Sequence, residues 1–383
     1  QNTDPSDPDS VPNIADQAVS QANYLKYVTD FHSNGDSAFI ENDYWTNPKG
    51  FWRQRATDPD LRVAPVPVML SAGYYDLVSI SNGALATWMN LVKSPKRVIM
   101  LAPHGHCGVE IGIERLRQGN RDNMVRRWFE RYLKGERNGI DRMPNVNLFA
   151  ENGNALWSAE SFPVKGTRYT PYYLGDSTLS TAKPTSSGSA TFAQVPANHV
   201  SDNEGTQPDT VTFTSEPMKR PQKLGGLITA DLYVTITNAN APTGLTDAHI
   251  TAQLYLLPSE GTRKALTPGW MRAGNRAVDV KRSVIGPGGV IVRPWHPNSR
   301  AAYQPVPSGS VQRYQIEINP LALQLNGGDQ LQLAITSHDS QVLLSTASQA
   351  QSAGGVVDVL YGPKTPSRVL FPILADESLR VTR

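Results

Sequence analysis

Apolar positions in the first half of the chain follow an α/β pattern. Two largely apolar runs, residues 66–73 and 97–102, are typical of parallel strands buried on both faces. A helix-sized segment, residues 82–91, separates them, and each run ends in polar residues. A further helix is predicted over residues 120–133. Its apolar stripe consists of Met124, Trp128, Phe129, Tyr132 and Leu133.

After residue 166 the pattern changes to period-two alternation. Runs such as 227–234, 249–256 and 330–335 alternate apolar and polar positions, as expected of strands with one buried face. Turn signals such as Asn326-Gly327-Gly328-Asp329 lie between the runs, and no convincing long helix interrupts them. The second half of the chain is therefore predicted to be an all-β sandwich.

The division of the chain follows from these patterns. Residues 1–18 are polar and rich in Asp, Ser and Pro, as in a solvated arm. An amphipathic helix is predicted over residues 22–31, and the aromatic residues of segment 44–52 are expected to pack against the next domain rather than line a substrate pocket. We predict an arm over 1–18, an α/β portion over 19–164 and a β-sandwich over 165–383.

Composition and charge exclude several classes of function. The 383 residues include 36 basic and 34 acidic side chains, a formal net charge of +2, so no excess of positive charge is available for a nucleic-acid backbone. No run approaches about 18 apolar residues, so no membrane-spanning helix is expected. The histidines other than His104 and His106 lie at no spacing typical of paired metal ligands. Neither a metal nor another cofactor is expected.

Two polar residues after the apolar runs could carry chemistry. Asp76 follows the first strand and His106 follows the second, 106 − 76 = 30 positions later, with one helix-sized crossover between them. In the order nucleophile, acid, histidine, such residues at the carboxyl ends of parallel strands form a catalytic triad. Spacing alone does not establish this role, because a strand-terminal Asp is commonly a cap and a loop His is commonly solvated.

At these residues the sequence resembles the family of cocaine esterases, α-amino-acid ester hydrolases and X-prolyl dipeptidyl aminopeptidases. Segment 66–76 is similar to the "VPxL…GWYD" segment that carries the acid, and segment 102–106 stands where the family has "GPWxH". Segment 128–135 resembles its "FFDRYLKG" helix. Three further segments, 213–217, 266–272 and 366–370, resemble the jelly-roll domain that follows. The resemblance covers roughly residues 40–383.

The resemblance implies a fold and a pair of catalytic residues. The fold class is α/β plus all-β: the C-terminal part of an α/β-hydrolase domain followed by a jelly-roll β-sandwich. Asp76 becomes the acid, and His106 rather than His104 becomes the base. Tyr75 and His104 are candidates for the substrate pocket, because His104 replaces the family's tryptophan beside the base.

The nucleophile of this family is absent from the chain. It lies in a Gly-x-Ser-x-Gly elbow, which the sequence does not contain, and only about 65 residues precede the acid strand. Ser71 lies inside the predicted acid strand, and Ser187 and Ser189 have no second glycine at elbow spacing. Cys107 is more simply a small buried residue than a nucleophile. We expect the serine to lie in an N-terminal half that this sequence lacks.

The sequence therefore predicts a serine hydrolase that acts on an ester, an amide or an X-Pro peptide. This chain would supply its acid and base, an N-terminal fragment would carry the serine, and the isolated chain would be inactive. The alternative is a non-catalytic binding or structural β-sandwich with an inert hydrolase remnant. The chain opens at Gln1 without a methionine or signal segment. A secreted or periplasmic location is favoured over the cytoplasm, although the single cysteine does not distinguish them.

Overall fold

The computed structural model describes residues 62–76, 81–105, 121–153, 155–194, 210–239, 244–246, 248–337 and 355–382. The predicted arm, the helix over 22–31 and the aromatic segment 44–52 lie outside these residues, as do His106 and Cys107. The chain forms two compact units. One comprises Gln1–Ala56 and Pro297–Tyr303, with the short 3-10 helix η5 (Arg300–Ala302); the other comprises Thr57–His296 and Gln304–Arg383 and is described below.

A five-stranded mixed sheet contains both predicted parallel strands. Its order is β1 (Val68–Gly73), β2 (Arg97–Ala102), β3 (Val146–Ala150), β4 (Ala155–Ala159) and β20 (Arg380–Thr382). The first three strands are parallel, and β4 and β20 join them in antiparallel pairing. Helix α4 (Ser81–Asn90) connects β1 to β2, and α6 (Arg121–Leu133) and the 3-10 helix η2 (Ile140–Arg142) precede β3.

Alternate residues of this sheet face two different cores. Val98, Met100, Phe149 and Leu156 pack with Met124 and Trp128 of α6. The opposite face, which includes Ile99, Leu101, Leu148 and Trp157, packs with α4 and with the large β structure described next. The two sheets therefore share one apolar core across the boundary predicted near residue 165.

Burial departs from the sequence prediction at two places. Strand β2 is buried almost throughout, but β1 is buried only toward its end, because among the described residues β2 is its only neighbour in the sheet. The stripe of α6 is narrower than predicted. Phe129 and Leu133 are 54% and 77% exposed, since only the face at positions 124, 128 and 132 meets the sheet.

The second half of the chain forms an eleven-stranded, largely antiparallel sheet. Its members are β5 (Arg168–Leu174), β6 (Thr178–Ser180), β7 (Gly188–Ala193), β8 (Thr210–Ser215), β9 (Gln222–Thr237), β11 (His249–Leu257), β12 (Lys264–Arg272), β16 (Val311–Leu325), β17 (Gln330–Thr336), β18 (Val356–Tyr361) and β19 (Arg368–Ile373). The order is β12-β11-β17-β8-β6-β5-β19-β9-β18-β7, with β16 also paired to β9.

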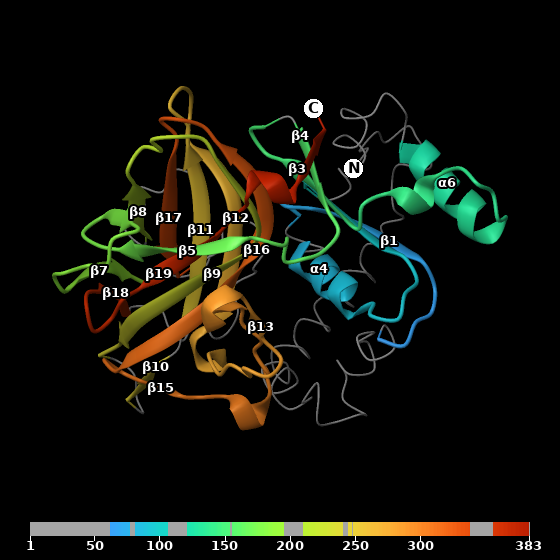
Figure 1. Cartoon of the computed structure of the whole chain (residues 1–383). Coiled ribbons are helices and arrows are strands. Elements are labelled where there is room, and N and C mark those ends of the chain that lie inside the picture. Colours follow the sequence, from blue (N-terminus) through green and yellow to red (C-terminus); the bar gives the residue numbers. More distant parts are fainter. Residues whose placement is uncertain are drawn as a thin grey trace, which may run out of the picture. The chain divides into compact units, whose positions relative to one another are not determined.

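Strand β9 lies at the centre of this structure. It pairs with the similarly long β16 along one edge, side by side in Figure 1, and successively with β19 and β18 along the other. Most of its residues are buried. The predicted alternating runs 227–234, 249–256 and 330–335 lie in β9, β11 and β17, and the described residues after 165 contain no α-helix. The change to β structure is confirmed, and the described part of the chain is mostly β with few helices.

Short elements complete the unit. Two small two-stranded sheets are described: β10 (Leu245–Thr246) pairs with the distant β15 (Val306–Pro307), and β13 (Val284–Ile285) forms a hairpin with β14 (Ile291–Arg293). The remaining 3-10 helices are η3 (Ala273–Asn275), η4 (Pro287–Gly289) and η6 (Asp376–Ser378).

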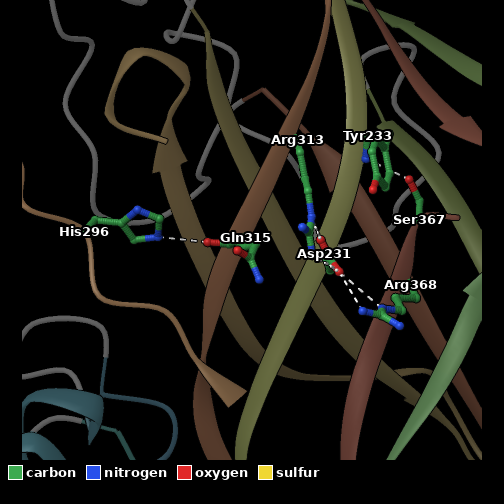
Figure 2. A network of polar contacts seen from close by, with 7 residues as sticks. All are labelled: Asp231, Tyr233, His296, Arg313, Gln315, Ser367 and Arg368. Carbon is green, nitrogen blue, oxygen red and sulfur yellow. Dashed lines mark hydrogen bonds and ion pairs between the residues drawn. The ribbon is translucent and has the colours of Figure 1, made fainter. Parts of the chain in front are cut away.

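A buried carboxylate joins the central strands (Figure 2). Asp231 on β9 is 2% exposed and accepts hydrogen bonds from Arg313 of β16 at 2.6 and 2.9 Å. Arg368 of β19 donates to the same carboxylate at 3.1 and 3.2 Å. Because each arginine comes from a strand that pairs with β9, the charged cluster holds three strands in register as well as neutralising the buried charge.

Candidate functional site

The two turns that carry the candidate acid and base begin at the same edge of the five-stranded sheet. Strands β1 and β2 are parallel neighbours, so their carboxyl ends lie side by side. The amide of Tyr74 donates to the carbonyl of Ala102 at 2.8 Å, and the amide of Tyr75 donates to the carbonyl of His104 at 3.1 Å. These bonds extend the pairing beyond the strands, to within one residue of Asp76.

Close packing of the two turns depends on Gly73. A Cβ atom at this position would lie 2.1 Å from the carbonyl oxygen of His104 and 2.4 Å from its ring nitrogen Nδ1. Any side chain here would push the second turn away from the first. The glycine before Tyr74 therefore lets the chain segment that leads to His106 approach the segment that carries Asp76.

Asp76 is buried at the end of the first turn. It is 7% exposed, and its amide donates to the carbonyl of Gly73 at 3.3 Å, which closes the turn. His106 lies outside the described residues, so the pairing of its ring with the Asp76 carboxylate stays a prediction. Asp76 lies at the edge of the sheet where β2 ends, four residues before His106.

His104 is held by its own loop. Its ring Nδ1 lies 2.9 Å from the carbonyl of Gly105, so this nitrogen carries the hydrogen and donates it. Its Nε2 is buried and has no hydrogen-bond partner in the described part of the chain. The ring thus lies against Gly73 with one nitrogen unused, and its role in a substrate pocket stays a prediction.

Tyr75 contacts a residue that sequence reasoning did not identify. Its hydroxyl donates to Oε2 of Glu151 at 2.9 Å, and the other carboxylate oxygen of Glu151 forms an ion pair with Lys264 at the start of β12. Burial raises the pKa of Tyr75, and the negative charge of Glu151 raises it further, so the phenol remains a neutral donor. The turn before Asp76 is therefore fastened to the large β structure.

Nothing in the sequence signals this network. Glu151 lies 76 positions after Tyr75, and Lys264 lies 113 positions after Glu151. The backbone explains why they meet: the amide of Glu151 donates to Ala322 of β16 at 2.8 Å, and its carbonyl accepts from Gln324 at 2.9 Å. Glu151 is thus fixed between the two sheets, with 12% of its side chain exposed.

Two other kinds of feature are absent from the described residues. Within these ranges no group of three or more His, Cys, Asp or Glu side chains is arranged to hold a metal ion. None of the helices described is long and apolar enough to cross a membrane. Neither finding bears on the acid and the base.

Comparison with known proteins gives consistent matches. Residues 138–369 match the family model described as the X-Pro dipeptidyl-peptidase C-terminal non-catalytic domain. The chain is 23% identical over 258 residues to the cocaine esterase of Rhodococcus sp. (strain MB1 Bresler), a match covering 58% of this chain and 43% of the esterase. Asp76 and His106 precede the residues that match the non-catalytic domain.

Solved structures match over most of this chain. A CocE/NonD family hydrolase from Staphylococcus aureus superposes with a TM-score of 0.67 at 19% identity, covering 85% of this chain and 57% of that protein. An α-amino acid ester hydrolase superposes with a TM-score of 0.67 at 16% identity, covering 93% of this chain and 62% of that protein. At such low identity these superpositions show a shared fold alone. The chain spans about half the length of the curated relatives it matches.

Proposed function

Because this chain belongs to the cocaine esterase and X-Pro dipeptidyl-peptidase family, we propose that it supplies the acid and base of a serine hydrolase. The observation that carries the proposal is the pairing of the turns after β1 and β2. Through this pairing the turn that ends at Asp76 is bonded to Ala102 and His104, just before His106 in the chain. The five-stranded sheet would then be the C-terminal part of an α/β-hydrolase sheet, and the larger β structure a jelly roll, divided near residue 165.

The proposed chemistry is acyl transfer. His106 takes the proton from a serine hydroxyl as the serine oxygen bonds to the substrate carbonyl, and returns that proton to the leaving alcohol or amine. Water then attacks the acyl-enzyme with His106 again acting as base, which releases the acid and regenerates the serine. Asp76 holds the imidazole in the required tautomer and stabilises the imidazolium. The substrate would be an ester, an amide or an X-Pro peptide.

The serine would come from outside this sequence, because the chain contains no Gly-x-Ser-x-Gly elbow. Two of the serines considered earlier, Ser71 and Ser189, lie in regular strands. Ser71 pairs with Met100 inside the parallel ladder of β1 and β2, and Ser189 lies in β7 opposite Leu360. A nucleophile elbow instead needs a sharp turn from a strand into a helix.

Labelling of the chain by itself tests the proposal. A base without a positioned hydroxyl forms no acyl-enzyme, so we expect no burst of product from an activated ester and no covalent adduct with a serine-directed phosphonate. Absorbance of the released product measures the burst, and mass spectrometry of the protein measures the adduct. A longer polypeptide that includes the elbow should label stoichiometrically. One adduct per molecule on any serine of the isolated chain would contradict the proposal.

A second candidate function is favoured by one comparison. More than half of the chain, residues 138–369, matches a domain described as non-catalytic, so the chain could serve as a binding or structural module with an inert remnant before it. The two candidates differ in their partners. Co-purification of a fragment that contains Gly-x-Ser-x-Gly supports the enzyme, whereas a gene product that begins near Gln1 and binds no such fragment supports the module.

A further inference from the structure

A cavity of about 990 Å³ opens in the described unit away from the turns that carry Asp76 and His104. Its walls come from the β3–β4 hairpin, the first residues of β9, the end of β16 and the segment after β19. These segments are far apart in the sequence and meet where the two sheets share their core. The volume lies at the upper end of the range of small-molecule pockets, about 300–1,000 Å³.

The charged side chains of this cavity are mostly positive. Arg168 at the start of β5, Arg220 before β9 and Lys223 in β9 line it, against a single lining carboxylate, that of Asp376. Lys223 forms an ion pair with Asp376, whose side chain is 82% exposed. Arg168 and Arg220 have no ion-pair partner in the part of the chain that the structure describes. Two guanidinium groups are therefore available to an incoming anion.

The rest of the lining is polar but uncharged, over an apolar floor. The amide nitrogen of Asn152 donates to the backbone carbonyl of Gln324 at 3.2 Å, which fixes one wall. A nearby carboxylate, Asp329, is 2% exposed, and the amides of Asn326 and Ser259 donate to it at 2.8 and 3.0 Å. Its charge is thus engaged by the turn rather than presented to the cavity. Beneath lies Trp157, 1% exposed.

We propose that this cavity binds a small oxyanion-bearing molecule through Arg168 and Arg220. A guanidinium presents paired N–H donors that match the oxygens of a carboxylate or a phosphate, and such charge-assisted pairs are stronger than neutral hydrogen bonds. The neutral amides around the arginines suit the polar body of such a ligand. None of the residues that line the cavity belongs to the turns that carry Asp76 and His104, and the proposal does not depend on the triad.

Direct binding to the folded chain tests the proposal. Isothermal titration at low salt with citrate and, separately, with inorganic phosphate shows which oxyanion is preferred, and uncharged glucose serves as the negative probe. We expect micromolar to low-millimolar binding of at least one anion and none of glucose. Loss of one charged hydrogen-bonding group should weaken binding about tenfold or more in Arg168→Gln and Arg220→Gln.

Two controls separate specific recognition from general attraction. Arg142→Gln removes an exposed charge elsewhere on the chain and should leave affinity unchanged. Arg168→Lys keeps the charge but removes the paired donors, so it should weaken binding nearly as much as Arg168→Gln. Circular dichroism melting of each variant verifies folding. Absence of binding to both anions, or equal weakening by Arg142→Gln, would overturn the proposal.

Discussion

Replacing His106 by alanine in a polypeptide that also contains the nucleophile is expected to lower kcat by about 10⁴-fold while leaving KM nearly unchanged. The imidazole acts on the proton that moves in the transition state, so its loss affects the chemical step rather than substrate binding. Steady-state hydrolysis of an activated ester measures both constants. Thermal melting establishes that the variant folds.

His104 provides the matched control, because it lies two residues earlier in the same loop. Its Nδ1 donates to the carbonyl of Gly105, and the family resemblance assigns the base to His106 instead. His104→Ala should therefore reduce kcat far less than His106→Ala. Equal losses from the two variants, or a larger loss from His104→Ala, would assign the base to the wrong histidine.

The largest effect on stability is expected at Asp231. Asp231→Ala should lower the free energy of unfolding by about 3 kcal/mol, because it leaves the guanidiniums of Arg313 and Arg368 without their carboxylate in the middle of the β structure. The effect should lie at the lower end of the range for buried pairs, since the Arg313 side chain is 47% exposed. Urea unfolding followed by fluorescence measures it.

An exposed ion pair supplies the comparison for Asp231. Asp376 pairs with Lys223, but its side chain is 82% exposed, and exposed pairs contribute about 0–1 kcal/mol. Asp376→Ala should therefore change the unfolding midpoint only slightly. If the two variants were equally destabilised, the buried Asp231 cluster would stabilise the fold no more than an exposed ion pair does, contrary to this account.

Local patterns in the sequence were sufficient for the elements near the candidate site. Largely apolar runs identified β1 and β2, the helix-sized segment between them identified α4, and an apolar stripe identified α6, because each signal lies within a few neighbouring residues. The exposure of Phe129 and Leu133 was not predicted. Which side chains of a helix contact a sheet depends on the orientation of the helix, and that orientation is set by tertiary packing.

Contacts between residues far apart in the chain could not be predicted from the sequence. The partner of Tyr75, Glu151, belongs to another strand end, and its ion-pair partner Lys264 belongs to a different sheet. Likewise, the clustering of Arg313 and Arg368 on Asp231 follows from the order of β16, β9 and β19, which no local periodicity encodes. The acid and base candidates came from motif order, a signal that identifies residues but not their separation.

A double-mutant cycle tests most directly whether Asp76 and His106 act as one catalytic unit. In the polypeptide that carries the nucleophile, kcat/KM is measured for Asp76→Asn, His106→Ala and the double variant. We expect each single variant to lose several orders of magnitude and the double variant to lose no more than His106→Ala alone, because Asp76 acts only through His106. Losses that multiply in the double variant would show independent roles and contradict the proposed acid–base pair.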